Sequence, residues 1–315
     1  MNIDFGKLDK IVEEFVNNKH NSVYINNLNQ VIPLCEEIIN KKDLLPVETK
    51  EYSTNYDLNK KIELVSSFLG TLNINLKDQF DNLVKMVDED GTPAIRFDSN
   101  DRNYAREGKA FIKINDDLYD MFMILHESLH VMNYYNVVDE NNNYMGENNT
   151  RKYYGEAVSI SAEKLFGNYL VKNNYITKND YNILMNNRLI SSKCDAKAVI
   201  IESILVDMKQ AGIEINYDNI KNYVEGLELS EAKKEAVSEE FQHGRDIWNI
   251  LDFNEMQFPI RQRYVIAQAL IGKLSTEELV KLNYEVGNPD ASLTEVTSSI
   301  RKWKGAKKEY NSLFN

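Results

Sequence analysis

Apolar residues recur at spacings of three and four along most of the chain, which is the pattern of amphipathic helices. The pattern predicts helices over residues 8–18, 24–41, 58–72 and 76–88, and Pro33 is expected to kink the second of them. Only 5 prolines and 13 glycines occur among 315 residues, so few positions interrupt helical structure. We therefore expect a mainly α protein.

The pattern changes between residues 91 and 114. Gly91, Thr92 and Pro93 form a turn signal, and the segments 94–97 and 110–114 show alternation or enrichment in β-branched residues. We expect two short strands here, paired antiparallel, as a small β element within the helical fold.

Two further helices follow this element. Asn115 or Asp116 supplies an N-cap for a helix over residues 117–135, and a polar loop over 136–150 leads to a second strong helix at 152–172. More amphipathic helices with short turns fill the remainder of the chain.

Neither an internal repeat nor a linker rich in glycine, serine or proline divides the chain. We expect a helical N-terminal lobe over residues 1–90 and a second lobe over residues 91–315, packed as one two-lobed unit. The active site is then expected in a cleft between the N-terminal lobe and the C-terminal helices.

The net charge is −12, and lysine and arginine are interleaved with acidic residues, so no nucleic-acid partner is expected. The first residues lack the features of an export signal, and no stretch offers about 18 uncharged apolar residues. We expect a cytoplasmic protein without a membrane anchor. Cys35 and Cys194 lie far apart, which indicates two buried, reduced thiols and no cysteine metal site.

The candidate chemistry lies on the 117–135 helix, where His126, Glu127 and His130 form an HExxH motif. Residues four apart are separated by about 40° around a helix axis, so both imidazoles project from one face and can bind one zinc ion. Glu127 then lies beside them in the position of a general base. The alternative is that both histidines are core residues that only form hydrogen bonds.

A catalytic zinc site takes three protein ligands and leaves the fourth position to water. No histidine follows closely after His130, so a carboxylate from the next helix is the natural third ligand. Glu156 and Glu163 are seven residues apart and share one stripe of that helix. We assign Glu156 as the ligand and Glu163 as a carboxylate that accepts a hydrogen bond from a histidine ligand. For Glu163, a solvated helix carboxylate is the alternative.

These segments resemble the active-site core of the thimet oligopeptidase and oligopeptidase F family of zinc metallopeptidases. The resemblance rests on the segment from Arg106 to Phe111, on the HExxH motif, and on the pattern ExxSxxxE that begins at Glu156, 26 residues after His130. It covers roughly residues 105–170 and is weak in the C-terminal third. It implies a zincin-like fold and supports Glu156 as the third ligand.

The resemblance also extends to a late helix around residues 261–267. There it implies that the hydroxyl of Tyr264 donates a hydrogen bond to the oxyanion of the tetrahedral intermediate. The family's His-x-x-Gly-Tyr segment is not recognisable before Tyr264, and a packing role is the alternative. His243 is another candidate for binding substrate or the oxyanion, with a structural role as its alternative.

Together the residues predict a zinc metalloendopeptidase that cleaves peptide bonds in oligopeptides, with one zinc ion per chain. Two alternatives remain open: a protein-specific, toxin-like gluzincin, and a metal-stabilised binding protein without catalysis. A purely structural site has no need of a base such as Glu127, which disfavours the second alternative. The sequence predicts neither the oligomeric state nor the cleavage-site preference.

Overall fold

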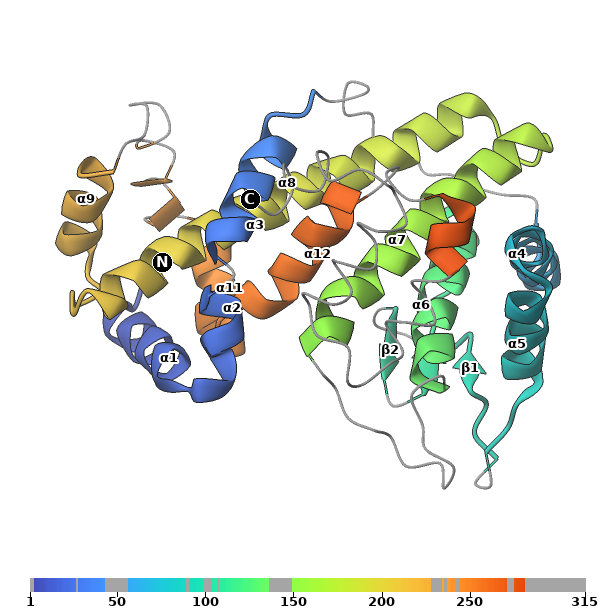
Figure 1. The fold of residues 1–315 in the computed structure, drawn as a ribbon, viewed down its shortest axis with the longest axis horizontal. Helices are drawn as coiled ribbons and strands as arrows, with labels where there is room; N and C mark the ends of the chain where they lie inside the picture. Colours follow the sequence, from blue (N-terminus) through green and yellow to red (C-terminus); the bar gives the residue numbers. More distant parts are fainter. Residues whose placement is uncertain are drawn as a thin grey trace. The chain divides into compact units, whose positions relative to one another are not determined.

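The computed structural model is mainly helical and contains one small mixed sheet of three strands, which confirms the mainly α prediction (Figure 1). The residues that the structure describes are 3–26, 28–42, 56–88, 91–98, 103–106, 108–135, 149–227, 234, 237–238, 240–241, 244–270 and 275–280.

The chain forms two compact units. Unit 1 holds the described residues of 3–41 and 191–265, and unit 2 holds those of 42–190 and 266–280. Residue 90, the expected boundary between the two lobes, lies in the range of unit 2, and the two-lobed organisation stays a prediction.

Unit 1 is helical. Its elements are α1 (Phe5–Asn17), the 3-10 turn η1 (Lys19–Asn21), α2 (Ser22–Asn26), α3 (Leu28–Ile39), the second part of α8 (Lys178–Gln210), α9 (Tyr217–Glu225), α11 (Arg245–Phe253) and the first part of α12 (Phe258–Leu270). The expected helix over 24–41 is thus present as α2 and α3, and Pro33 lies inside α3. Lys209 joins α8 to α1, because its Nζ lies 3.0 Å from both carboxylate oxygens of Asp9.

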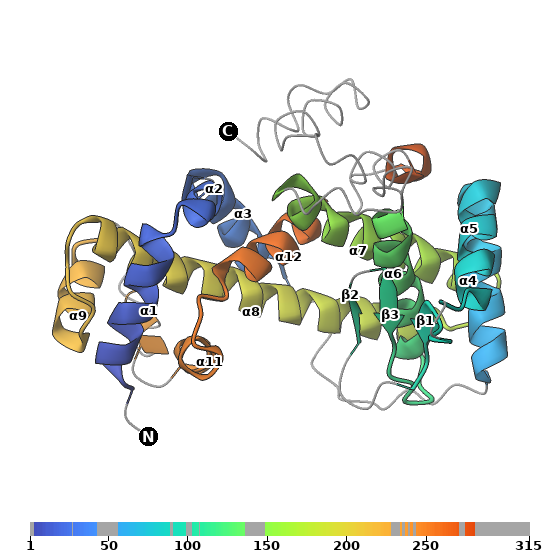
Figure 2. The same cartoon turned by 90° about the horizontal axis from the view of Figure 1, so that it is seen from below.

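Unit 2 is built around one helix, α6 (Tyr119–Tyr135). Figures 1 and 2 show α6 with α7 on one side and the pair α4 and α5 on the other, and α6 contacts all three as well as β2 and β3. The remaining elements of unit 2 are α4 (Leu58–Leu72), α5 (Ile74–Lys85), β1 (Ile95–Arg96), β2 (Tyr104–Arg106), β3 (Lys109–Phe111), α7 (Asn149–Lys172) and the first part of α8.

The sheet has the order β1-β3-β2 and is mixed. β1 pairs parallel with β3, with Ile95 opposite Ala110, so the expected antiparallel pairing of these two segments is wrong. β3 takes its antiparallel neighbour from β2, the segment immediately before it, through a turn at Gly108 whose φ is 76°. That pairing leaves the other edge of β3 for β1. β2 is a strand of three residues that alternation along the sequence did not reveal.

Helix α6 is buried on all sides. Every residue from Asp120 to Leu129 is buried, as are Val131, Met132 and Asn133, which is the pattern of a helix in the centre of a domain. The helix begins later than expected, and Asp117 Oδ1 accepts a hydrogen bond from the backbone N–H of Asp120 at 3.2 Å. Asp116 has a φ of 58°, which is incompatible with the extended backbone of an N-cap, so the predicted cap at Asn115 or Asp116 is wrong.

A cluster of aromatic rings fixes α6 and α7 relative to α4. The ring of Phe166 on α7 lies 5.1 Å from Phe68 on α4 and 5.3 Å from Phe122 on α6, measured between ring centroids. All three side chains are at most 2% exposed. Aromatic pairs at this distance contribute packing energy with a defined geometry, so the cluster gives α6 and α7 a fixed separation.

A buried ion pair links α4 to the start of α6. Lys61 Nζ donates to Asp120 Oδ2 at 2.7 Å, and the two side chains are 0% and 1% exposed. Asp120 Oδ1 accepts a second hydrogen bond from the backbone N–H of Asn115 at 3.0 Å. Each partner satisfies a charge that would be costly to bury alone.

Replacing Lys61 by methionine is therefore expected to lower the free energy of unfolding by about 3 to 5 kcal/mol, because the carboxylate of Asp120 is left buried and unpaired. Urea unfolding followed by circular dichroism measures the change. Lys60→Met is the matched control, since the adjacent Lys60 makes a 2.8 Å ion pair with Glu63 that is open to solvent, and it should unfold almost as the unaltered protein does. Equal stability of the two variants would contradict the prediction.

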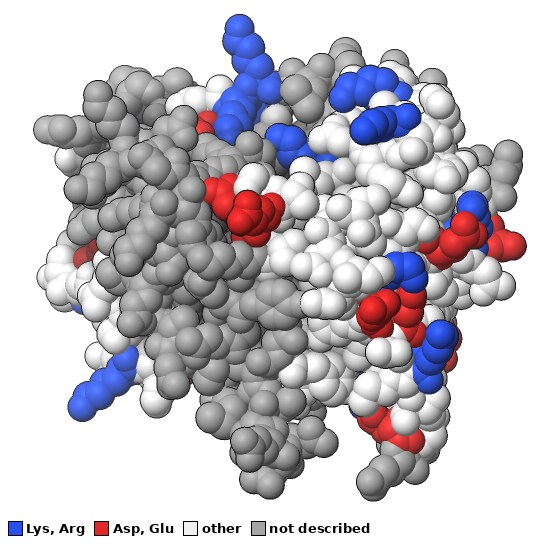
Figure 3. Space-filling model, turned by 45° about the vertical axis from the view of Figure 1, so that its right-hand side comes forward, with Lys and Arg blue, Asp and Glu red and all other residues white. Residues whose placement is uncertain are grey.

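The two cysteine side chains differ in their exposure to solvent. Cys35 is buried and Cys194 is exposed, so the expectation that both thiols are buried is wrong for Cys194. On the face drawn in Figure 3, acidic and basic side chains of the described residues adjoin one another along the right-hand side. Among the described helices, none has both the length and the apolar character needed to cross a membrane.

Candidate metal centre

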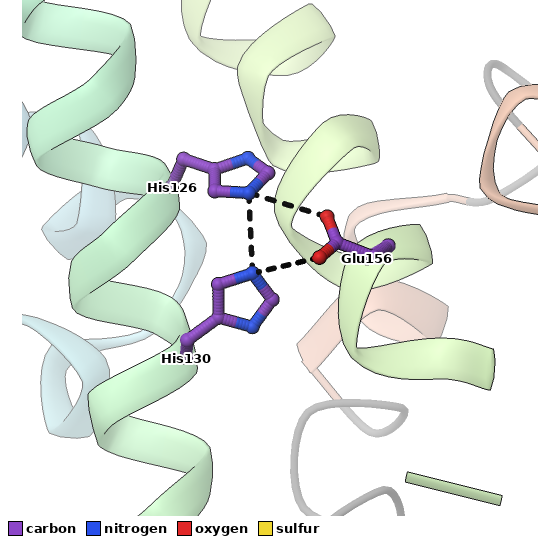
Figure 4. Close-up of side chains that lie close together, drawn as sticks. All are labelled: His126, His130 and Glu156. Carbon is purple, nitrogen blue, oxygen red and sulfur yellow. Dashed lines mark hydrogen bonds and ion pairs between the residues drawn. The ribbon is translucent and has the colours of Figure 1, made fainter. Parts of the chain in front are cut away.

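Three side chains predicted to bind zinc converge in unit 2 (Figure 4). His126 and His130 project from one face of α6 toward Glu156 on α7, and their Nε2 atoms are 3.1 Å apart. Glu156 Oε2 lies 3.2 Å from Nε2 of His126, and Glu156 Oε1 lies 3.5 Å from Nε2 of His130. The structure thus brings together the two histidines of the motif and the carboxylate assigned as their partner.

Local structure explains this arrangement. The spacing of four residues places both imidazoles on the same side of α6, with ring centroids 4.8 Å apart. The hydroxyl of Ser159 donates to the backbone carbonyl oxygen of His126 at 3.3 Å, which ties α7 to α6 at the level of the site. Ser159 lies three residues after Glu156, so one turn of α7 carries both the carboxylate of the site and the hydroxyl that bonds to α6.

Glu163 lies behind His126 and supports it. Its Oε1 is 2.6 Å from His126 Nδ1, and the carboxylate is 1% exposed. Arg188 on α8 holds the same carboxylate, with Nε donating to Oε2 at 3.1 Å and a terminal nitrogen donating to Oε1. Glu163 is therefore a buried, paired carboxylate, and the alternative of a solvated helix position is wrong for it.

The electrostatics of the site reflect these contacts. Burial lowers the pKa of His126, but the carboxylates of Glu156 and Glu163 outweigh it and raise that pKa to about 10. Burial raises the pKa of Glu156, but the two histidines outweigh it and hold that pKa well below its usual value. In the metal-free protein the protonated ring of His126 thus lies between the two carboxylates, and its Nε2 proton faces Glu156, in the place where a cation would also be stabilised.

The donor set fits a divalent metal ion. Ligand atoms about 2.0–2.1 Å from a tetrahedral zinc ion lie about 3.3 Å from one another, close to the separations found among His126, His130 and Glu156. Among the described residues, Oε2 of Glu156 is buried and accepts no well-directed hydrogen bond. The carboxylates of Glu156 and Glu163 both stabilise positive charge at His126, so a cation is favoured at this position.

Glu127 lies in the same electrostatic environment. It follows His126 on α6 and is 6% exposed. Burial raises the pKa of its carboxyl, while the nearby charges of His126 and His130 oppose that shift. A carboxylate whose pKa is raised toward neutrality accepts and returns a proton more readily than an ordinary glutamate.

The other two predicted residues, Tyr264 and His243, remain predictions. Tyr264 belongs to α12 in unit 1, so its hydrogen bond to an oxyanion at this site stays a prediction. His243 lies outside the described residues.

Sequence reasoning missed two residues of unit 2. Arg188 contacts Glu163, and no motif surrounds it in the sequence. Tyr119 lies seven residues before His126 on the same stripe of α6, a helical spacing that could have indicated it. Burial raises the pKa of Tyr119, and the charges of Arg188, Glu163 and Glu127 also act on its hydroxyl.

Comparison of the chain with protein-family models, with curated proteins and with solved structures finds no significant match. The site therefore stands on its own geometry.

The pKa of His126 leads to a pH prediction for the metal-free protein. Because the folded state holds this proton more tightly than the unfolded state, whose histidine pKa is about 6.5, the stabilisation is complete below that value. It is lost as the pH rises toward about 10. The thermal unfolding midpoint, measured with a chelator present, should fall between pH 7 and pH 10. His126→Gln should show a smaller fall, and an equal fall in both proteins would contradict the assignment.

Proposed function

We propose that this chain is a zinc metallopeptidase that hydrolyses peptide bonds, with oligopeptides as its substrates. The observation that carries the proposal is the convergence of two Nε2 atoms and one carboxylate at the mutual spacing of metal ligands. Two histidines and one glutamate form the ligand set of catalytic zinc sites, which leave a fourth position open. Closed structural sites use four protein ligands instead.

In this proposal His126, His130 and Glu156 hold the metal. When bound, zinc polarises the carbonyl group of the scissile peptide bond and lowers the pKa of a water molecule. Glu163 accepts a hydrogen bond from Nδ1 of His126, which leaves the lone pair of Nε2 directed at the metal position. These residues hold the metal, and a different residue carries out the proton transfers.

Glu127 is the general base of the proposed reaction. Its carboxylate takes a proton from the attacking water and delivers it to the leaving amine. Its burial supports this role, because a raised pKa lets the same group act as base and then as acid near neutral pH.

A hydrogen-bond donor directed at the oxyanion would stabilise it as the tetrahedral intermediate forms. Tyr264 takes this role in the proposal by its resemblance to the late tyrosine of the oligopeptidases. A zincin-like core, with a cleft that admits an extended peptide, belongs to the same proposal.

Incubation of the zinc-loaded protein with a mixed peptide library tests the function. Products read by mass spectrometry should appear with zinc and disappear when a chelator is added. The lengths of the cleaved peptides distinguish an oligopeptidase from a protease that ignores short peptides and cuts one long substrate. A zinc-loaded protein that cleaves neither peptides nor unfolded proteins would refute the proposal and favour a metal-stabilised binding protein.

A further inference from the structure

Arg188 is a charged residue at the site for which neither metal binding nor proton transfer requires a role. It lies on α8, and its guanidinium donates from Nε to Glu163 Oε2 at 3.1 Å and from a terminal nitrogen to Glu163 Oε1. Its side chain is 18% exposed, whereas that of Glu163 is 1% exposed. The contact is a forked, two-point ion pair with a carboxylate that has almost no access to water.

The reason for this pair lies in the cost of burying Glu163. A carboxylate that is 1% exposed is costly to bury without a partner, and here both of its oxygens accept hydrogen bonds from the Arg188 guanidinium. Arg188 thus supplies a positive charge that compensates the burial of Glu163.

The ion pair also sets the orientation of Glu163. A guanidinium binds both carboxylate oxygens in one plane, so the carboxylate cannot rotate freely about its terminal bond. Oε1 is then held 2.6 Å from Nδ1 of His126. A fixed acceptor at Nδ1 holds a proton on that nitrogen, so Nε2 is the nitrogen that gives up its proton and binds metal.

We infer that Arg188 is a positioning residue for the metal centre, acting through Glu163 to fix the ring orientation and tautomer of His126. This inference rests on the proposed function, because it takes His126 to be a zinc ligand. Arg188 itself touches neither metal nor substrate in this scheme. Its effect is therefore expected on metal affinity and on the ligand geometry, in addition to activity.

The test compares variants of the full chain. Arg188→Met should weaken zinc binding about 10- to 100-fold, as is usual for the loss of a partner that supports a ligand. Arg188→Lys keeps the positive charge but loses the two-point contact with Glu163. Its zinc affinity should therefore lie between those of the unaltered protein and Arg188→Met. Arg96→Met is the matched control, since Arg96 forms the same kind of forked pair with Asp98 on the surface of unit 2, with distances of 3.0 and 2.7 Å. It should bind zinc as the unaltered protein does.

Two readouts are measured, zinc affinity by competition with a chromophoric chelator and the visible absorption spectrum of the cobalt(II)-loaded protein. A purely structural role would leave the cobalt spectrum unchanged, whereas the inference predicts a changed spectrum in Arg188→Met and a smaller change in Arg188→Lys. If Arg188→Met does not fold, Arg188→Lys decides the question with the same two readouts.

The outcomes also separate this inference from the proposed function. Normal affinity and a normal cobalt spectrum in the folded Arg188 variants, beside an unaltered protein that binds zinc, would overturn the role of Arg188 alone. An unaltered protein that binds neither zinc nor cobalt would overturn both proposals.

Discussion

Replacement of Glu127 by glutamine is expected to reduce kcat/KM for peptide hydrolysis about 10²- to 10⁴-fold while leaving the zinc content unchanged. The amide of glutamine has nearly the shape of the carboxylate, but it cannot accept a proton from water and return it. Glu127 is not among the three residues whose ligand atoms converge, so its loss should not release the metal. Zinc analysis and steady-state kinetics on the same preparation measure both quantities.

Ser128 offers a matched control for this variant. It is the next residue on α6 and is fully buried, and its hydroxyl makes no hydrogen bond to any residue that the structure describes. Ser128→Ala should therefore keep both zinc and activity. If Glu127→Gln hydrolysed peptides as fast as Ser128→Ala, Glu127 would not be the base.

Removal of a metal ligand is expected to have the second large effect. Glu156→Ala or His130→Ala should lower zinc affinity by more than the roughly 10- to 100-fold loss expected for a supporting residue, because a direct bond to the metal is lost. Hydrolysis should then fall to background at zinc concentrations that saturate the unaltered protein. Competition with a chromophoric chelator gives the affinities.

The control for the ligand variants is His20→Ala. His20 is an exposed histidine in η1, in unit 1, and it takes no part in the converging group. Its replacement should leave zinc affinity unchanged. A ligand variant that bound zinc as tightly as His20→Ala would remove that residue from the proposed ligand set.

The burial of α6 connects the fold to the chemistry. A helix buried on all sides normally carries apolar residues only, yet α6 contains Asp120, His126 and Glu127 among its buried positions. Asp120 is paired with Lys61, and His126 is paired with Glu163. Polar residues in such a helix carry a cost in stability, which these partners offset for Asp120 and His126.

The parts of the site that the sequence predicted are those with a local signature. His126 and His130 share a face because both lie on one helix, and the spacing of Glu156, Ser159 and Glu163 on the next helix places them on one stripe. The assignment of Glu156 as a ligand also required the helix that follows the motif to contact it, and α7 does contact α6. These predictions depended on helical geometry, which is regular.

The parts that the sequence did not predict depend on contacts between distant segments. Arg188 lies 25 positions after Glu163 on another helix, and no spacing rule connects the two. The parallel pairing of β1 with β3 depends on where β2 folds back, through a turn at Gly108 that was not recognised. The division into two units falls within α8, a continuous helix of 33 residues without any sequence signal at that point. Tertiary contacts of this kind leave no periodic pattern along the chain.

Anomalous X-ray diffraction from zinc-loaded crystals, collected at the zinc absorption edge, tests the metal centre most directly. A single strong peak is expected between α6 and α7, about 2.0 to 2.2 Å from Nε2 of His126, Nε2 of His130 and a carboxylate oxygen of Glu156. A zinc-loaded crystal in which these three side chains point away from the anomalous peak would contradict the proposed site and the hydrolytic function built on it.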